Sequence, residues 1–154
     1  MSFSLPKYFG VNEHKMDPKF RVSIPSAWRP EDGEQLILRN LTDCSIPHIQ
    51  VLTEAALAKA IADIEKTECT SGQMRDAIQL LYRSIQIVRI SNQGKLQIPK
   101  EWSLQANIPA ESKVILSGSG EYFEIYEPSV FSAIDSAQKS SVSGTMAHTH
   151  LFPK

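Results

Sequence analysis

The sequence has no long hydrophobic run and only two cysteines. No apolar stretch approaches the roughly 20 residues needed to cross a bilayer. The first ten residues have neither the basic start nor the apolar stretch of about 7–15 residues that marks a signal peptide. Cys44 and Cys69 have no histidine at metal-ligand spacing, so we expect reduced thiols and no zinc site. These absences predict a soluble, cytoplasmic protein with no membrane partner.

An excess of charge of one sign is also lacking. The 154 residues carry a net charge of −1, and the pI is about 6.4. A nucleic-acid-binding domain with a broad basic surface usually has a pI above about 9, so only a small basic face remains compatible with DNA binding. Hydrophobic residues make up 42% of the chain, enough for a globular protein with one core, or with two small halves that share one.

Catalytic arrangements do not stand out either. The sequence shows no Ser/His/Asp, Cys/His or paired-carboxylate pattern. The stretch SGSGEY (117–122) contains glycine but lacks the Lys-Ser/Thr of a phosphate-binding loop, and it is typical of a turn between strands. We therefore predict a protein that is not an enzyme and has no catalytic residue, metal, cofactor or small-molecule substrate.

What the sequence does contain is an internal repeat. The stretches DPKFRVSIP (17–25) and SNQGKLQIP (91–99) share one skeleton, and the offset 95 − 21 = 74 also carries Trp28 onto Trp102. Each stretch has turn-forming residues followed by alternating apolar and polar side chains, which is the period-two pattern of a half-buried strand. The repeat predicts two β-hairpins, each with one apolar face.

Further strands and helices follow each hairpin. Four segments have the pattern of strands: 35–41, 48–52, 113–118 and 122–127. In both copies the last strand leads into a helix, with Thr53 as the N-cap of the first and Glu127-Pro128 opening a short second one. Between the copies, residues 71–84 have a helical pattern, so we expect a helical hairpin there.

The predicted architecture is an α+β, mainly β, internally duplicated domain over residues 1–137. Its two repeats cover about 8–66 and 83–137, and the helix at about 71–84 joins them. Residues 138–154 are rich in serine and threonine and lack periodicity, so we expect a flexible tail.

Basic residues gather around the two turns. Arg21 and Lys95 occupy matching positions, each opposite the apolar face of its strand. The other cations near the turns are Lys15, Lys19, Arg29, Arg89 and Lys100. In a single hairpin, Asp17 would cap the turn and Arg21 would project into water. Two copies related by a pseudo-two-fold axis could instead gather these cations on one surface able to contact phosphates and a DNA groove.

With these motifs in place, the chain resembles the MraZ family of the AbrB/MazE-like swapped-hairpin transcription factors. The resemblance covers roughly residues 8–135, and its most specific parts are EHKMDPKFRVSIPSAW, NQGKLQIPKEW and GSGEYFEIYEPSVF. It implies two repeats that interleave their hairpins into one small β-barrel, and several chains that close into a homo-oligomeric ring. It also implies a nucleoid-associated regulator, generally a repressor, which binds direct repeats of double-stranded DNA in the promoter of the division and cell-wall gene cluster.

The chain departs from the family pattern of Asp-x-x-x-Arg with glycine before the arginine. The first copy keeps Asp17 and Arg21 but has Phe20 in place of glycine, so we expect a turn of different shape or an outward-facing ring. The second copy keeps Gly94 but has Ser91 in place of the aspartate and Lys95 in place of the arginine. The alternative to a DNA-binding regulator is therefore a ring-forming scaffold or protein-binding module that has lost operator binding.

By this resemblance, the residues implied in DNA contact are Arg21 and Lys95. Because they lie near these two, Lys19 and Lys15 in the first copy and Lys100 in the second are also expected to contact DNA. Arginine can donate two hydrogen bonds to guanine, whereas lysine acts as a point charge, so the first copy should carry more specificity. The residues expected to shape the turns are Asp17, Phe20, Ser91 and Gly94, with Asp17 orienting Arg21.

Overall fold

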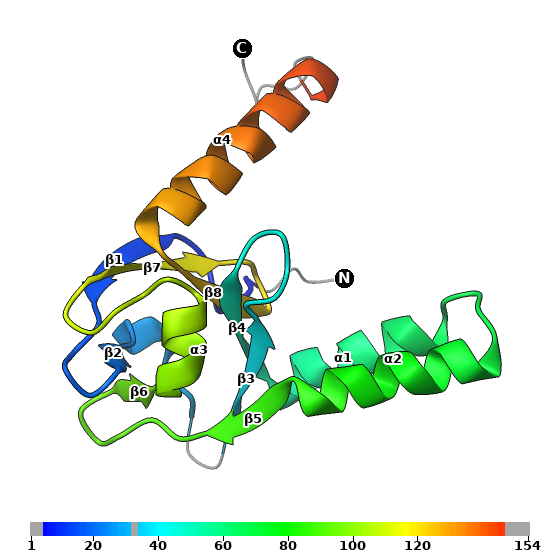
Figure 1. Cartoon of the computed structure of the whole chain (residues 1–154), viewed down its shortest axis with the longest axis horizontal. Helices are drawn as coiled ribbons and strands as arrows, with labels where there is room; N and C mark the ends of the chain where they lie inside the picture. Colours follow the sequence, from blue (N-terminus) through cyan, green and yellow to red (C-terminus); the bar gives the residue numbers. More distant parts are fainter. Residues whose placement is uncertain (1–4, 32–33, 147–154) are drawn as a thin grey trace.

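The computed structural model describes residues 5–31 and 34–146, and Figure 1 shows the arrangement. The larger sheet is antiparallel and has six strands, in the order β1 (Val11–Lys15), β7 (Lys113–Gly118), β8 (Tyr122–Tyr126), β4 (His48–Thr53), β3 (Leu36–Leu41) and β5 (Ile85–Val88). A two-stranded ribbon pairs β2 (Arg21–Ser23) with β6 (Lys95–Gln97). The predicted α+β class is confirmed, with a core built mainly on strands. The larger sheet is open, with β1 and β5 at its edges, so the predicted barrel is not confirmed.

The two predicted hairpins take a different form in the structure. The strands on either side of each turn do not pair along their length: β1 pairs with β7, β5 with β3, and β2 with β6. A local bond still closes each turn, from the Asp17 N–H to the Arg21 carbonyl at 2.9 Å and from the Ser91 N–H to the Lys95 carbonyl at 3.0 Å. The strands on either side of each turn are therefore paired with strands of the opposite copy.

Residues that the sequence repeat relates lie opposite each other in two places. Val22 faces Leu96 in the ribbon, where 22 + 74 = 96. Gln50 faces Glu124 between β4 and β8, where 50 + 74 = 124. A strand that pairs with its own copy in this way has the register expected of two halves related by a two-fold rotation.

The core lies between the ribbon and the larger sheet. The inward side chains of the ribbon region, Val22, Ile24, Leu96 and Ile98, are all buried. Burying one side chain of this size contributes about 1.5–3 kcal/mol, so the short ribbon is held mainly by this face. Trp28 is buried against Tyr8 and Phe123, whereas its repeat partner Trp102 is half-buried at the edge of the core.

Two helices between the copies form the predicted helical hairpin, which extends away from the sheets in Figure 1. Helix α1 (Glu54–Glu65) begins after Thr53, whose hydroxyl accepts a hydrogen bond from the Ala56 N–H and confirms the predicted N-cap. Helix α2 (Ser71–Arg83) starts with a capping box built on Thr70. None of the helices among the described residues is both long and apolar enough to span a membrane.

Two short helices were not expected. Each Ile-Pro leads into helical backbone, a single 3₁₀ turn at Ser26–Trp28 in the first copy and helix α3 (Lys100–Gln105) in the second. The proline at each N-cap position fixes a backbone angle compatible with the start of a helix.

The C-terminal helix is longer than predicted. Helix α4 (Pro128–Thr145) begins at the Glu127 cap, whose side chain accepts a hydrogen bond from the Val130 N–H, and it continues past residue 137. The expected flexible tail, 138–154, is therefore wrong for residues 138–145, and residues 147–154 lie outside the described part of the chain. An ion pair between Asp135 and Lys139 at 2.8 Å crosses the expected boundary and supports the extension.

Candidate nucleic-acid interface

The candidate interface is the outer surface of the β2–β6 ribbon together with the first turn (residues 17–20) and the second turn (residues 91–94). Because strand side chains alternate, the residues next to buried Val22 and Leu96 point outward. The ribbon register places Arg21 beside Gln97, and Ser23 beside Lys95. The outer surface is therefore polar, with one cation from each copy.

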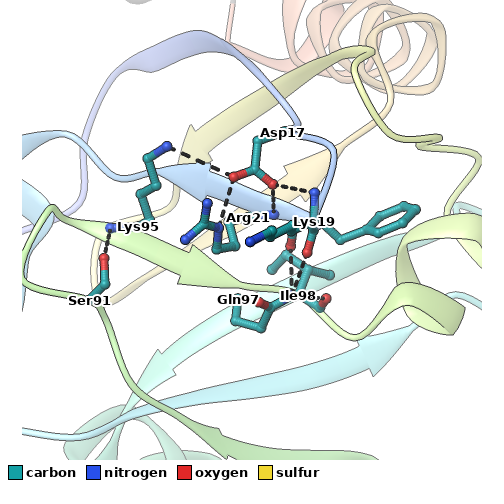
Figure 2. A network of polar contacts seen from close by, with 8 residues as sticks. Asp17, Lys19, Arg21, Ser91, Lys95, Gln97 and Ile98 are labelled. Atoms are coloured by element: carbon teal, nitrogen blue, oxygen red, sulfur yellow. Dashed lines mark hydrogen bonds and ion pairs between the residues drawn. The ribbon is translucent and has the colours of Figure 1, made fainter.

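Asp17 organises the first turn, as Figure 2 shows. Its Oδ1 accepts hydrogen bonds from the backbone N–H groups of Lys19 and Arg21, each at 2.8 Å. Its Oδ2 accepts one from Nε of Arg21, also at 2.8 Å. The terminal guanidinium nitrogens of Arg21 have no partner within the residues that the structure describes, so the end of the fork remains free to bind.

The Asp17 carboxylate also links the two copies electrostatically. Lys95 extends from β6 so that its Nζ lies 3.9 Å from Asp17 Oδ2 (Figure 2). Burial on its own would raise the pKa of Asp17, but the hydrogen bonds from the Arg21 and Lys19 N–H groups and from the Arg21 guanidinium outweigh it and lower the pKa below its ordinary value. The carboxylate is thus ionised at neutral pH and is balanced by cations from both copies.

Phe20 corrects an expectation about the first turn. Its φ is 61°, close to the 74° of Gly94 at the matching position of the second turn. The N–H of Phe20 donates to the Asp17 carbonyl at 3.1 Å, and the N–H of Gly94 donates to the Ser91 carbonyl at 2.9 Å. The two turns therefore have one backbone shape, and the Phe20 ring packs against the core instead of facing outward. A bulky residue at positive φ costs about 1–3 kcal/mol.

The second turn has a weaker side-chain support. The hydroxyl of Ser91 accepts one hydrogen bond, from the Lys95 N–H at 3.2 Å, where Asp17 accepts three in the first turn. Lys95, in the place of Arg21, directs its ammonium group toward Asp17 of the other copy. The structure thus brings together Asp17, Arg21 and Lys95 from the two motifs.

Gln97 is a part of this surface that the sequence did not reveal. Its side-chain amide donates to the carbonyls of Lys19 at 2.9 Å and Phe20 at 3.2 Å, so β6 supports the first turn (Figure 2). The matching residue in the first copy, Ser23, has a shorter side chain. The sequence signal that could have revealed Gln97 is its longer side chain compared with Ser23 at the matching outward position.

The remaining predicted cations flank this network. Lys19 lies in the first turn, Lys15 ends β1 and Lys100 begins α3, and all three are exposed. No ion pair of these three side chains occurs among the described residues. They could supply charge around the ribbon without fixing its geometry.

Comparisons with known proteins give consistent names. A protein from Alkaliphilus metalliredigens named "Transcriptional regulator MraZ" is 27% identical over 124 residues, which is 77% of this chain and 80% of the relative. One of the same name from Dehalococcoides mccartyi is 29% identical over 120 residues, 78% of this chain and 82% of the relative. Another from Nitratidesulfovibrio vulgaris is 26% identical over 147 residues, 90% of this chain and 92% of the relative. No family model matches the chain.

Proposed function

We propose that this chain, a member of the MraZ family of transcriptional regulators, binds double-stranded DNA through the outer surface of its β2–β6 ribbon. The observation that carries the proposal is that the Arg21 guanidinium is held at one end and, among the described residues, free at the other. Asp17 fixes the guanidinium through Nε, while the other end of the fork is free and Lys95 lies nearby on the same surface. A fixed arginine loses less conformational entropy when it binds.

Two-stranded ribbons are of a size that enters the major groove. Arg21 would donate two hydrogen bonds to guanine O6 and N7, which is the commonest specific arginine contact. Lys95, Lys19, Lys15 and Lys100 would contact phosphates, which position the protein without reading sequence. Asp17 would repel phosphate and acts by holding Arg21 and the turn.

We also propose that the chain is an internally duplicated, swapped-hairpin barrel. The opposed pairs Val22–Leu96 and Gln50–Glu124 support this relation between the copies. So do two reciprocal bonds, from the Ile24 N–H to the Gly94 carbonyl and from the Ile98 N–H to the Phe20 carbonyl, both at 2.9 Å. Each copy thereby holds the positive-φ residue of the other.

The low charge of the chain favours several binding surfaces in one assembly. Affinity depends on how many phosphates are neutralised, and two to four contacts by one chain would bind weakly at physiological salt. A homo-oligomeric ring on promoter direct repeats would make later contacts intramolecular and could gain about 10²–10⁴ in avidity. We propose this assembly at the nucleoid, as a repressor of the division and cell-wall gene cluster.

The test compares DNA from upstream of the protein's own gene with a scrambled fragment of equal length, at two salt concentrations. Wild-type protein should prefer the upstream fragment, and Arg21→Ala should reduce that preference by about 5- to 150-fold. The thermal midpoint of the variant is measured in parallel, because Arg21 also takes part in the first turn. Equal affinity of wild-type protein for both fragments would refute sequence-specific binding.

That outcome would favour the second candidate, a ring-forming scaffold or protein-binding module without operator binding. The observation that supports this candidate is the second turn, where Ser91 stands in place of aspartate, Lys95 stands in place of arginine, and Lys95 points toward Asp17. Light scattering separates the assembly from DNA binding. A monomer that still bound the upstream fragment tightly would contradict the role given to the ring.

A further inference from the structure

Arg29, from the first copy, covers the second turn. Its Nε donates to the Ile24 carbonyl at 3.2 Å. Its guanidinium lies so close to Gly94 that a Cβ placed on that glycine would collide with Cζ, Nε and Nη2 of Arg29. Gly94 is buried, whereas Arg29 itself is exposed. An arginine side chain therefore forms the outer surface at the tip of the second turn.

The matching place in the first turn has no such cover. The offset of 74 relates Arg29 to Ser103 and Gly94 to Phe20. Ser103 is fully buried, and its hydroxyl donates to the Ile108 carbonyl at 2.6 Å. Phe20 already carries the Cβ for which a guanidinium leaves no room. The differences at the two pairs of positions are consistent with each other. The turn that an arginine side chain covers has a glycine, and the turn without that arginine has a residue with a Cβ.

This pairing changes the balance of charge between the turns. The first turn has its own arginine, Arg21, held by Asp17. The second turn has lysine at that position, and the ammonium group of Lys95 is directed to Asp17. Residues 91–95 contain no arginine, so the second turn and the position that matches Arg21 supply no guanidinium of their own.

We propose that Arg29 is a DNA-contacting residue that supplies the second turn with the guanidinium its own sequence lacks. The assignment rests on the proposed DNA binding and adds a residue outside the two repeated motifs. Since Nε is engaged with the Ile24 carbonyl, binding uses the two terminal nitrogens, which have no partner among residues 5–31 and 34–146. These nitrogens match a pair of acceptors, either two phosphate oxygens or guanine O6 and N7.

The first experiment measures the affinity of Arg29→Ala and Arg29→Lys for the upstream and scrambled fragments over a range of salt. Arg29→Ala should bind the upstream fragment at least about fivefold more weakly than wild type. If Arg29 contacts a phosphate, Arg29→Ala should lower the affinity for both fragments equally and reduce the slope of log affinity against log salt by about 1. Arg29→Lys should then retain most of the wild-type affinity. If Arg29 contacts a guanine, Arg29→Ala should lower the affinity for the upstream fragment alone, and Arg29→Lys should not retain that affinity. The control is Arg75→Ala, an exposed arginine on α2, which should bind like wild type.

A second experiment tests the geometry through Gly94→Ala in two backgrounds. The added methyl group collides with the guanidinium when Arg29 is present, and Arg29→Ala removes the three atoms that lie nearest to it. Strain from the positive φ at residue 94 is common to both backgrounds and cancels in the double-mutant cycle. Gly94→Ala should therefore weaken DNA binding and lower the thermal midpoint more in the Arg29 background than in Arg29→Ala.

The outcomes separate this assignment from the proposed function. Wild-type binding by a folded Arg29→Ala, with binding still lost in Arg21→Ala, would leave the proposed function intact and overturn the role of Arg29. If Arg29→Ala does not fold, the DNA affinities of Arg29→Lys and Gly94→Ala test the role of Arg29. Wild-type affinity in both variants would overturn that role. Equal wild-type affinity for upstream and scrambled DNA would instead overturn the proposed function.

Discussion

The first and second turns have the same backbone shape and different side chains to hold it. Phe20 and Gly94 have φ values of 61° and 74°, although one is a bulky aromatic residue and the other a glycine. In both turns the carbonyl of this residue accepts a bond from the opposite copy, from Ile98 or from Ile24. The shared shape therefore goes with the same backbone bonds in both turns, two local ones and one from the opposite copy, and not with one kind of side chain at the positive-φ position.

The two turns differ more in how their charged side chains are arranged. In the first, one carboxylate fixes a guanidinium and closes the backbone. In the second turn, the Ser91 hydroxyl accepts a hydrogen bond from the Lys95 N–H but binds no cationic side chain within the described residues. The ammonium group of Lys95 lies instead near the Asp17 carboxylate of the first turn. Asp17 thus serves both copies, which makes it the most sensitive point of the surface.

The largest expected effect is that of Asp17→Ala. The change leaves three donors without an acceptor: the N–H groups of Lys19 and Arg21, and Nε of Arg21. Hydrogen bonds to charged groups contribute about 1.5–3 kcal/mol each in favourable cases, but solvent can replace part of them at this half-exposed turn. We expect the free energy of unfolding to fall by about 2 kcal/mol, measured by urea denaturation.

Ser91→Ala is the matched control for Asp17→Ala. It removes one neutral hydrogen bond of 3.2 Å, so the expected loss is about 0.5 kcal/mol. Equal losses for the two variants would contradict the asymmetry between the turns.

The next effect concerns the positive φ at Phe20. Phe20→Ala and Phe20→Gly both remove the ring from its place against the core, but only glycine relieves the backbone strain. We expect Phe20→Gly to be about 1 kcal/mol more stable than Phe20→Ala in urea denaturation, the reverse of the order in a helix or strand. If alanine is the more stable variant, the first turn does not hold residue 20 in the left-handed region.

Most strands and the helices between the copies could be predicted from the sequence because their signals are local. The short apolar run in KVILSG was enough to predict the strand that the structure places at Lys113–Gly118. Thr53 and Glu127 carry the side-chain oxygens that cap the helices after them, and both caps are present. The cation of the first motif was found because the repeat places Lys95 at the position that matches Arg21, since the Asp17–Arg21 spacing alone is also typical of an ordinary turn.

The strand partners and the exact turn shapes could not be predicted because they depend on distant residues. Period-two alternation shows which face of a strand is buried, but it does not show which strand will bury it. Phe20 is unfavourable at positive φ by local criteria, and the bond from Ile98 that holds it comes from the other copy. Gln97 and Arg29 act in the same way, since each contacts the turn of the copy to which it does not belong.

The smallest effect we expect is a pH dependence confined to the first turn. The pKa of Asp17 in the folded protein lies below its ordinary value of 3.8, so its stabilising contribution is present above about pH 4 and is lost as the pH falls through the folded-state pKa. The stability gap between wild type and Asp17→Asn, measured by urea denaturation, should therefore narrow as the pH falls below about 4. The gap between wild type and Ser91→Ala should stay constant over the same range, because Ser91 has no ionisable group. A constant gap for Asp17→Asn would mean that the turn needs the carboxyl oxygen as an acceptor and does not need its charge.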